Sequence, residues 1–155
     1  MTDDPSSRHP LDIPPLYFLL AILAMTGLHY LLPIADLIDR PWSYLGLVPI
    51  VLGVGLAVWA ERLFSWAGTG VRPFTPSTAL VTAGPYRFTR NPMYLGMLLV
   101  LAGGWLMIGS LGAALVIPVF FWWIRSRFVL PEEAHMERHF GEGYLAFKTA
   151  VRRWL

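Results

Sequence analysis

The fold is decided by residues 93–124, which read MYLGMLLVLAGGWLMIGSLGAALVIPVFFWWI and contain no charged side chain. A single helix of this length would span about 48 Å, at about 1.5 Å per residue, whereas the hydrocarbon core of a bilayer is about 30 Å thick. Turn-forming residues stand near the middle of the run, as Gly103-Gly104 and as GSLG at 109–112. We therefore expect a tight hairpin of two membrane helices, residues 93–108 and 111–127.

Two more apolar blocks precede this run. Residues 16–34 contain one ionisable side chain, His29, and residues 44–60 contain none. The whole chain is 55% hydrophobic and 14% charged, whereas about a quarter of the residues in a soluble domain are charged. The sequence therefore predicts an all-α polytopic membrane protein, one membrane-embedded domain over residues 1–155 with about four transmembrane helices. We expect the first block to be a retained helix rather than a cleaved signal peptide, because acids precede it and no small-residue cleavage site follows.

Two polar regions flank the predicted hairpin. Residues 65–92 are punctuated by glycine and proline, which predicts an irregular loop with short ordered pieces. After the hairpin, Pro131-Glu132-Glu133 is typical of a helix start, because proline fits the first turn and acids there complement the helix dipole. Residues 131–155 are predicted to form an amphipathic helix at the membrane interface, interrupted at 141–143. Its apolar stripe recurs every three or four residues, as Met136, Phe140, Tyr144, Phe147, Val151 and Trp154.

The arginines predict the orientation in the membrane. They gather in residues 61–90 and after residue 124, whereas the opposite turns carry only Arg40 beside Asp36 and Asp39. The positive-inside tendency then places both termini in the cytoplasm, and we expect an integral protein of the inner or plasma membrane of a prokaryote. The bilayer is the expected partner. A net charge of +2 argues against nucleic acid, and the absence of cysteine excludes thiolate metal sites.

Small residues and one proline stand inside the predicted helices. Glycines there generally let neighbouring backbones approach closely. Pro118 is expected to kink the fourth helix, because it lacks the N–H that an interior helical residue donates. The glycines concerned are Gly53, Gly55, Gly96, Gly103 and Gly104.

Polar side chains gather at the predicted entrance of the third helix. Arg90 and Tyr94 share a face if the helix begins near Arg90, and Tyr86 and Asn91 stand close by. A guanidinium, a phenol and exposed helix N–H groups at one mouth can receive an anion such as a carboxylate. The alternative is that these residues only anchor the chain at the headgroup level, where tyrosine and arginine are common.

Acids and histidines of the tail allow further chemistry. Glu132 and Glu133 are adjacent, so on a helix they diverge by about 100° and cannot form a paired acid–base dyad. One of them can face inward and hold hydroxyls of a ligand while the other faces water, or both can serve the helix dipole. His135 and His139 have a spacing that suits zinc, but no third ligand is near, so we expect no metal site.

Several spaced elements, in this order, resemble the isoprenylcysteine carboxyl methyltransferase family and the related phospholipid methyltransferases over about residues 75–154. The elements are Thr78-Ala79-Leu80-Val81-Thr82-Ala83-Gly84-Pro85-Tyr86, Arg90-Asn91-Pro92-Met93-Tyr94-Leu95-Gly96, Glu132-Glu133, Phe140-Gly141 and Tyr144. The resemblance implies an integral membrane enzyme that moves a methyl group from S-adenosylmethionine to a lipophilic small molecule or lipid.

The resemblance also implies which residues bind the cofactor. The contacts expected from the family are Thr78, Ala79, Leu80, Val81, Tyr86, Asn91, Pro92, Met93, Tyr94 and Glu132, with Arg90 as a further candidate for the methionine carboxylate. Arg127 and Glu133 are expected on the acceptor side. The eukaryotic prenylcysteine enzymes have histidine where this chain has Asn91, and an acceptor-binding arginine where it has Phe128. These departures argue against a prenylcysteine carboxylate as the acceptor.

Two other functions remain open from the sequence. Membrane sterol or enone reductases, which use NADPH, have a related Arg-x-Pro-x-Tyr segment. A non-catalytic membrane scaffold would use the arginine-rich loop to bind anionic headgroups. The sequence leaves the acceptor open among prenylcysteine, phosphatidylethanolamine, another lipid amine and a small thiol. It also leaves open the oligomeric state, the need for a general base, and the roles of His29 and of the pair His135 and His139.

Overall fold

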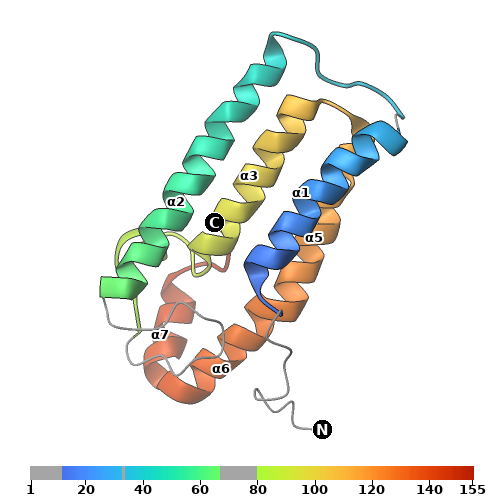
Figure 1. Cartoon of the computed structure of the whole chain (residues 1–155). Helices are drawn as coiled ribbons and strands as arrows, with labels where there is room; N and C mark the ends of the chain where they lie inside the picture. Colours follow the sequence, from blue (N-terminus) through green and yellow to red (C-terminus); the bar gives the residue numbers. More distant parts are fainter. Residues whose placement is uncertain (1–11, 33, 67–79) are drawn as a thin grey trace, which may run out of the picture.

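The computed structural model describes residues 12–32, 34–66 and 80–155, and these parts of the chain are predominantly helical (Figure 1). Three helices are long and apolar enough to cross a membrane, Pro14–Leu31, Trp42–Trp66 and Leu111–Phe140, and the apolar helix Pro92–Ile108 is shorter. The predicted all-α polytopic membrane fold is thus confirmed. The elements are α1 (Pro14–Leu31), η2 (Trp42–Gly46), α2 (Leu47–Trp66), η3 (Gly84–Arg87), α3 (Pro92–Ile108), α4 (Leu111–Ala114), α5 (Val116–Ile124), η4 (Arg125–Val129), α6 (Leu130–Phe140) and α7 (Glu142–Ala150).

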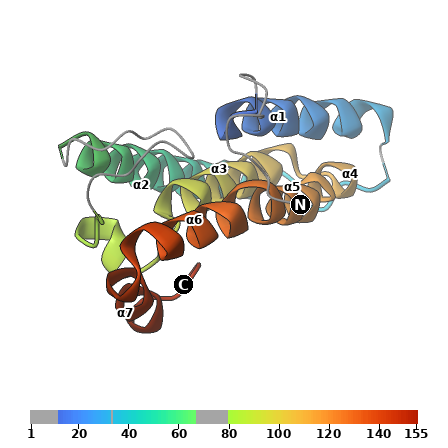
Figure 2. The same ribbon diagram turned by 90° about the horizontal axis from the view of Figure 1, so that it is seen from below.

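The long helices lie side by side, with α3 between α2 and the pair α1 and α5 (Figures 1 and 2). α6 and α7 continue beyond one end of this bundle, and the C-terminus lies near the start of α3. The core is apolar and includes Met25, Leu101, Ile124 and Phe128. Much of the outer surface is also apolar, as expected for helices that face lipid rather than water.

α2 and α3 pack closely because glycines of the two helices face each other. A Cβ placed on Gly53 would lie 2.5 Å from the carbonyl oxygen of Gly96, and one placed on Gly96 would lie 2.6 Å from that of Gly53. Gly46 and Gly103 form a second contact of this kind. The expected close approach is therefore confirmed at Gly53, Gly96 and Gly103. It is wrong for two other glycines, since nothing lies within 4 Å of a Cβ on Gly55 and only the Met25 sulfur, at 3.8 Å, approaches one on Gly104.

Gly53→Ala is expected to lower the free energy of unfolding by about 1–3 kcal/mol, because the added methyl group must push the two backbones apart. Gly55→Ala is the matched control. It meets no neighbour within 4 Å, so we expect it to be neutral or stabilising by up to about 1 kcal/mol through helix propensity. Unfolding of the purified protein in mixed detergent–SDS micelles measures both. Equal effects of the two substitutions would contradict the packing contact.

The predicted hairpin turn lies between α3 and α4. Gly109 ends α3 with φ of 76°, a conformation that favours glycine, and its N–H donates to the Trp105 carbonyl at 2.7 Å. Ser110 then caps α4, since its Oγ accepts from the Ala113 N–H at 3.3 Å. The segment that follows α1 is fixed to this turn, because the Leu37 N–H donates to the Gly109 carbonyl at 2.7 Å. The turn therefore also positions the connection from α1 to α2.

The last membrane segment differs from the prediction. The helix is interrupted at Leu115, three residues before Pro118, whose missing N–H leaves a carbonyl of the preceding turn without its usual donor. No new helix begins at Pro131. The helix instead runs on from α5 to α6 through the π-helical η4, which has one extra residue in its turn, directly before a proline that cannot donate.

The tail, predicted as a helix over 131–155 with an interruption at 141–143, consists of two helices that are separated at Gly141. α6 ends at Phe140, and Gly141 has φ of 53°, so the chain turns there before α7. α7 ends at Ala150, and the last five residues are not helical. This break lets α7 turn back toward the start of α3, so that Tyr144 and Phe147 line the same cavity as Tyr94 (Figure 1).

Candidate functional site

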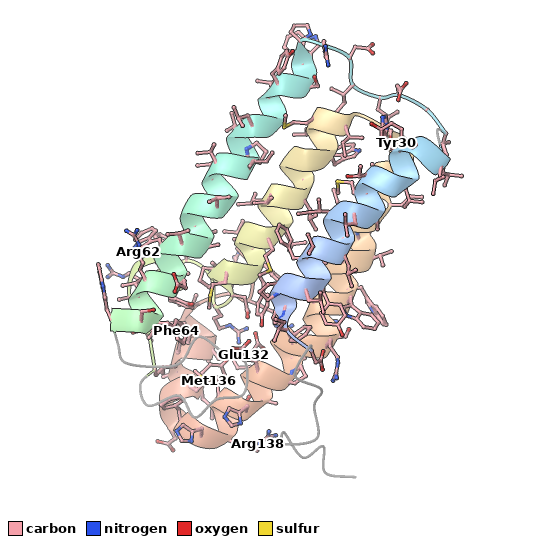
Figure 3. The ribbon with its side chains drawn as sticks, viewed as in Figure 1. Tyr30, Arg62, Phe64, Glu132, Met136 and Arg138 are labelled. Atoms are coloured by element: carbon pink, nitrogen blue, oxygen red, sulfur yellow. The ribbon has the colours of Figure 1, made fainter. Side chains whose placement is uncertain are left out.

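A cavity lies at the end of the bundle where α6 and α7 pass the ends of α2 and α3. Its enclosed space is about 50 Å³, and about 510 Å³ including the open mouth, so a nucleoside-sized ligand must also use the mouth. The loop and α3 contribute Leu80, Val81, Tyr86, Arg90, Asn91, Pro92, Met93 and Tyr94, and the other helices contribute Phe64, Glu132, Glu133, Met136, Tyr144 and Phe147. Figure 3 shows Phe64 close to Glu132 and Met136, with Tyr30 at the opposite end of the bundle.

The cavity brings together every described residue that was predicted to bind a cofactor. Thr78 and Ala79 lie outside the described residues, and the other nine candidates all line the cavity. Glu133, predicted on the acceptor side, lines it as well. Arg127 does not. Its guanidinium forms an ion pair with Asp12, just before α1, on another side of the helix that includes α6.

The entrance of α3 differs in detail from the prediction. The helix begins at Pro92, so Arg90 precedes it and does not share a helical face with Tyr94. Arg90 is fixed instead by its backbone N–H, which donates to the Arg152 carbonyl at 3.0 Å. Thr89 adds a local constraint, because its hydroxyl accepts from the Asn91 N–H at 3.2 Å. The cavity wall here is thus formed by an irregular turn that is held by the chain terminus.

Tyr94 and Glu132 form the first polar pair of the cavity. Tyr94 is buried on the first turns of α3, and its hydroxyl donates to Glu132 Oε2 at 3.1 Å. The bond joins the third membrane helix to α6 across the cavity. Glu132 is only partly buried, and its second carboxylate oxygen has no described protein donor within hydrogen-bond distance. It is therefore placed to accept from a hydroxyl or amino group of a ligand.

Glu133 is the centre of a buried charge cluster. Its Oε1 accepts from Arg153 Nε at 3.0 Å and from Asn91 Nδ2 at 3.3 Å, and its Oε2 accepts from Arg153 Nη2 at 2.9 Å. Arg90 Nη1 lies 3.3 Å from Oε1. Of the options that the sequence left open for the two adjacent acids, the one with a single inward acid does not apply, because Glu132 and Glu133 both line the cavity. The tail and the start of α3 close over Glu133, so only 8% of its side chain is exposed.

Three buried polar atoms in the cavity wall have no hydrogen-bond partner among the described residues. They are the hydroxyl oxygen of Tyr86 and both Nε and Nη1 of Arg90, although Nη1 lies within ion-pair distance of Glu133. The Tyr86 ring packs on Phe64 with centroids 5.3 Å apart, which fixes its direction. Burial, and to a lesser degree the charge of Glu132, raises the pKa of the Tyr86 phenol above its ordinary value, so the hydroxyl keeps its proton. Buried donors without acceptors are costly, so these atoms are placed to bond to a ligand or to water.

Sequence reasoning missed part of the cavity. Met136, Tyr144 and Phe147 belong to the predicted apolar stripe of the tail, yet they line the cavity rather than only facing the membrane surface. Their spacing was the available signal, since one face of a helix has to cover something apolar. Arg153 was also missed. Nothing in the local pattern indicates that the residue two positions from the end of the chain bonds to Glu133.

Other residues considered from the sequence lie elsewhere. Phe128, at the position of the family's acceptor-binding arginine, is fully buried, with its ring 5.6 Å from that of Tyr17. The rings of His135 and His139 are parallel with centroids 6.2 Å apart. No group of three or more potential metal ligands occurs within residues 12–32, 34–66 and 80–155.

Comparison with known proteins gives one family match. The family model described as phospholipid methyltransferase matches residues 42–143, from η2 into α7. A protein-S-isoprenylcysteine O-methyltransferase of Schizosaccharomyces pombe is 29% identical over 72 residues, which are 46% of this chain and 30% of that enzyme. An uncharacterised protein of Haemophilus influenzae is 38% identical over 63 residues, 41% of this chain and all of that protein. No solved structure matches the chain.

Proposed function

The chain belongs to the phospholipid methyltransferase family, and from this premise we propose that it transfers a methyl group from S-adenosylmethionine to a lipophilic acceptor. It is an integral membrane protein with a methyltransferase family domain. The use of S-adenosylmethionine, the acceptor class and the roles of individual residues are the proposal. The match to the yeast enzyme covers less than a third of that enzyme, so its substrate does not carry over by itself.

One observation carries the proposal. Tyr86, Tyr94 and Glu132, which come from three separate segments of the chain, line one cavity together with Arg90. Among the described residues the buried hydroxyl of Tyr86 and Nε of Arg90 have no hydrogen-bond partner, as expected of groups that bind a polar ligand. Phe64, Met136 and Phe147 give the same cavity an apolar wall suited to a nucleoside base.

Each of these groups matches a part of S-adenosylmethionine. Arg90 would hold the carboxylate through a charge-assisted hydrogen bond, and Glu132 the ribose hydroxyls or the amino group. The rings of Tyr86 and Tyr94 would border the sulfonium, which aromatic faces attract. When bound, S-adenosylmethionine supplies a methyl group that passes from its sulfonium sulfur to a lone pair on the acceptor, leaving neutral S-adenosylhomocysteine. The protein then mainly aligns the two reactants and excludes water.

We also propose that the cavity faces the cytoplasm. Figure 3 shows Arg62 and Arg138 at its end of the bundle, whereas the opposite connection carries Arg40 beside Asp36 and Asp39. The positive-inside tendency favours this orientation. A water-soluble cofactor then enters from the cytosol, and the lipophilic acceptor enters from the bilayer.

The test is direct. Purified protein in detergent is titrated calorimetrically with S-adenosylhomocysteine, and is then incubated with radiolabelled S-adenosylmethionine and a membrane lipid extract. We expect saturable binding and label in a chromatographically distinct lipid. Folded protein that binds neither S-adenosylmethionine nor S-adenosylhomocysteine would overturn the proposal. Thermal protection by NADPH alone would favour a reductase instead.

Tyr86→Phe is expected to have opposite effects on binding and stability. Removing the hydroxyl loses one hydrogen bond to the ligand, worth about 0.5–1.5 kcal/mol, which corresponds to a loss of affinity of about twofold to tenfold. The free protein loses no described partner, because this buried hydroxyl bonds to none of residues 12–32, 34–66 and 80–155, so its melting temperature should stay unchanged or rise. Calorimetry and a thermal melt of the same sample check both. A destabilised variant would show that the hydroxyl already serves the protein.

A further inference from the structure

The end of the chain returns to the cavity and is fixed there. After α7, the Arg153 carbonyl accepts from the Thr89 hydroxyl at 3.0 Å and from Asn91 Nδ2 at 3.2 Å. Beyond it, Trp154 packs on Phe121 with ring centroids 5.1 Å apart, which ties the tail to α5. These residues follow the last residue matched by the family model, so the family match gives no role to the tail.

The Arg153 side chain makes a two-point contact with Glu133. Its Nε and Nη2 donate to the two carboxylate oxygens at 3.0 and 2.9 Å, the parallel arrangement that gives the strongest guanidinium–carboxylate pairs. This bond raises the pKa of Arg153, so the pair is ionised. Arg90 touches the same carboxylate with one nitrogen only, at 3.3 Å. Glu133 is therefore satisfied chiefly by Arg153 and only secondarily by Arg90.

The charges of this cluster leave a surplus on Arg90. Two guanidiniums share the Glu133 carboxylate, and among the described residues no ion pair joins either of them to the other cavity acid, Glu132, which bonds to Tyr94. Only 8% of the Arg90 side chain is exposed, and its Nε has no partner among the described residues. In a site with so little water an unmatched positive charge attracts an anion strongly.

We propose that Arg153 is a positioning residue that neutralises Glu133 and so leaves the Arg90 guanidinium to bind the carboxylate of the ligand. The ligand identity rests on the proposed function, but the charge arrangement does not. Without Arg153, Glu133 takes Arg90 as its only charged partner. The carboxylate of the ligand then approaches an Arg90–Glu133 pair that has no net charge. Because the Glu133 oxygens repel it, its binding weakens.

The test compares two ligands that differ only in this group. S-Adenosylmethionine carries the carboxylate, and its decarboxylated form retains the adenosine, the sulfonium and the amine. We expect the intact full-length protein to prefer S-adenosylmethionine and Arg153→Gln to reduce this preference about tenfold, chiefly by weakening S-adenosylmethionine. Arg153→Lys keeps the charge and is expected to retain most of the preference. Lys148→Gln, which breaks a half-exposed ion pair with Glu137, is the matched control and should leave the preference unchanged.

The outcomes separate the two proposals. If the wild-type protein binds neither ligand, the proposed function is wrong. If it binds both equally, or if Arg153→Gln weakens both by the same factor, Arg153 does not act through the carboxylate and the inference is overturned. Should Arg153→Gln fail to fold, Arg153→Lys decides: loss of the preference in a folded lysine variant contradicts a role of the charge, and retention supports it.

Discussion

Glu133→Ala is expected to lower the free energy of unfolding by about 3–5 kcal/mol, the largest stability effect of any substitution at the site. The reason is that the carboxylate is the counter-ion shared by two guanidiniums, and Arg90 is as deeply buried as Glu133 itself. Removing it leaves a buried positive charge without a counter-ion and the Asn91 amide without one of its acceptors. Unfolding in mixed detergent–SDS micelles, followed by tryptophan fluorescence, measures the change.

The matched control is Glu137→Ala on the same helix. Glu137 pairs with Lys148 at 2.9 Å, but both side chains are about 40% exposed, so its loss should cost no more than about 1 kcal/mol. Glu133→Gln retains the shape and can still accept from Asn91, and should fall between the two. If Glu133→Ala and Glu137→Ala destabilise equally, the cluster around Glu133 is not formed as described.

Glu132→Gln is expected to weaken S-adenosylhomocysteine binding about tenfold to a hundredfold without a comparable loss of stability. A hydrogen bond to a charged group contributes about 1.5–3 kcal/mol, and the amide that replaces the carboxylate lacks that charge. The protein itself loses less, because the glutamine oxygen still accepts from the Tyr94 hydroxyl. Titration calorimetry on folded variants gives the affinities.

Two further measurements make this result specific. Glu137→Gln removes the same charge five residues along the helix, outside the cavity lining, and should bind as the wild type does. 5′-Methylthioadenosine lacks the amino acid end of the ligand, so a loss that appears with both ligands assigns Glu132 to the ribose. A loss with S-adenosylhomocysteine alone assigns it to the amino group. Unchanged affinity for both would remove Glu132 from the binding site.

The two adjacent acids thus have separate tasks, although they are consecutive in the sequence. Glu132 bonds to α3 and keeps an oxygen available at the cavity, whereas all the acceptor capacity of Glu133 is directed at the start of α3 and at the tail. The π-helical η4 contributes to this arrangement. Its extra residue turns every later side chain by about 100° relative to a continuous α-helix. The π-helical turn at Arg125–Val129 therefore determines which side chains of α6 face the cavity.

The sequence by itself determined the helices and the position of the site. A run without charge that exceeds the bilayer thickness has to turn, and the turn falls at Gly109 and Ser110 because glycine adopts positive φ and serine caps a helix. Local order likewise predicted Tyr86, Arg90 and Tyr94 at the start of α3, and all three line the cavity. These features depend on residues that are neighbours in the sequence and on whether their side chains prefer lipid or water. A single sequence is therefore enough to predict them.

Only the tertiary structure decided how the site is closed. The bond from the Arg90 N–H to the Arg152 carbonyl and the bonds from Arg153 to Glu133 join segments distant in sequence. A tail arginine and a buried glutamate show no local pattern, because an ion pair needs only proximity in space. Arg127 lies away from the cavity and forms an ion pair with Asp12, although its position in the sequence is close to that of Glu132. Composition and periodicity determine which elements form, whereas packing determines which of their side chains meet.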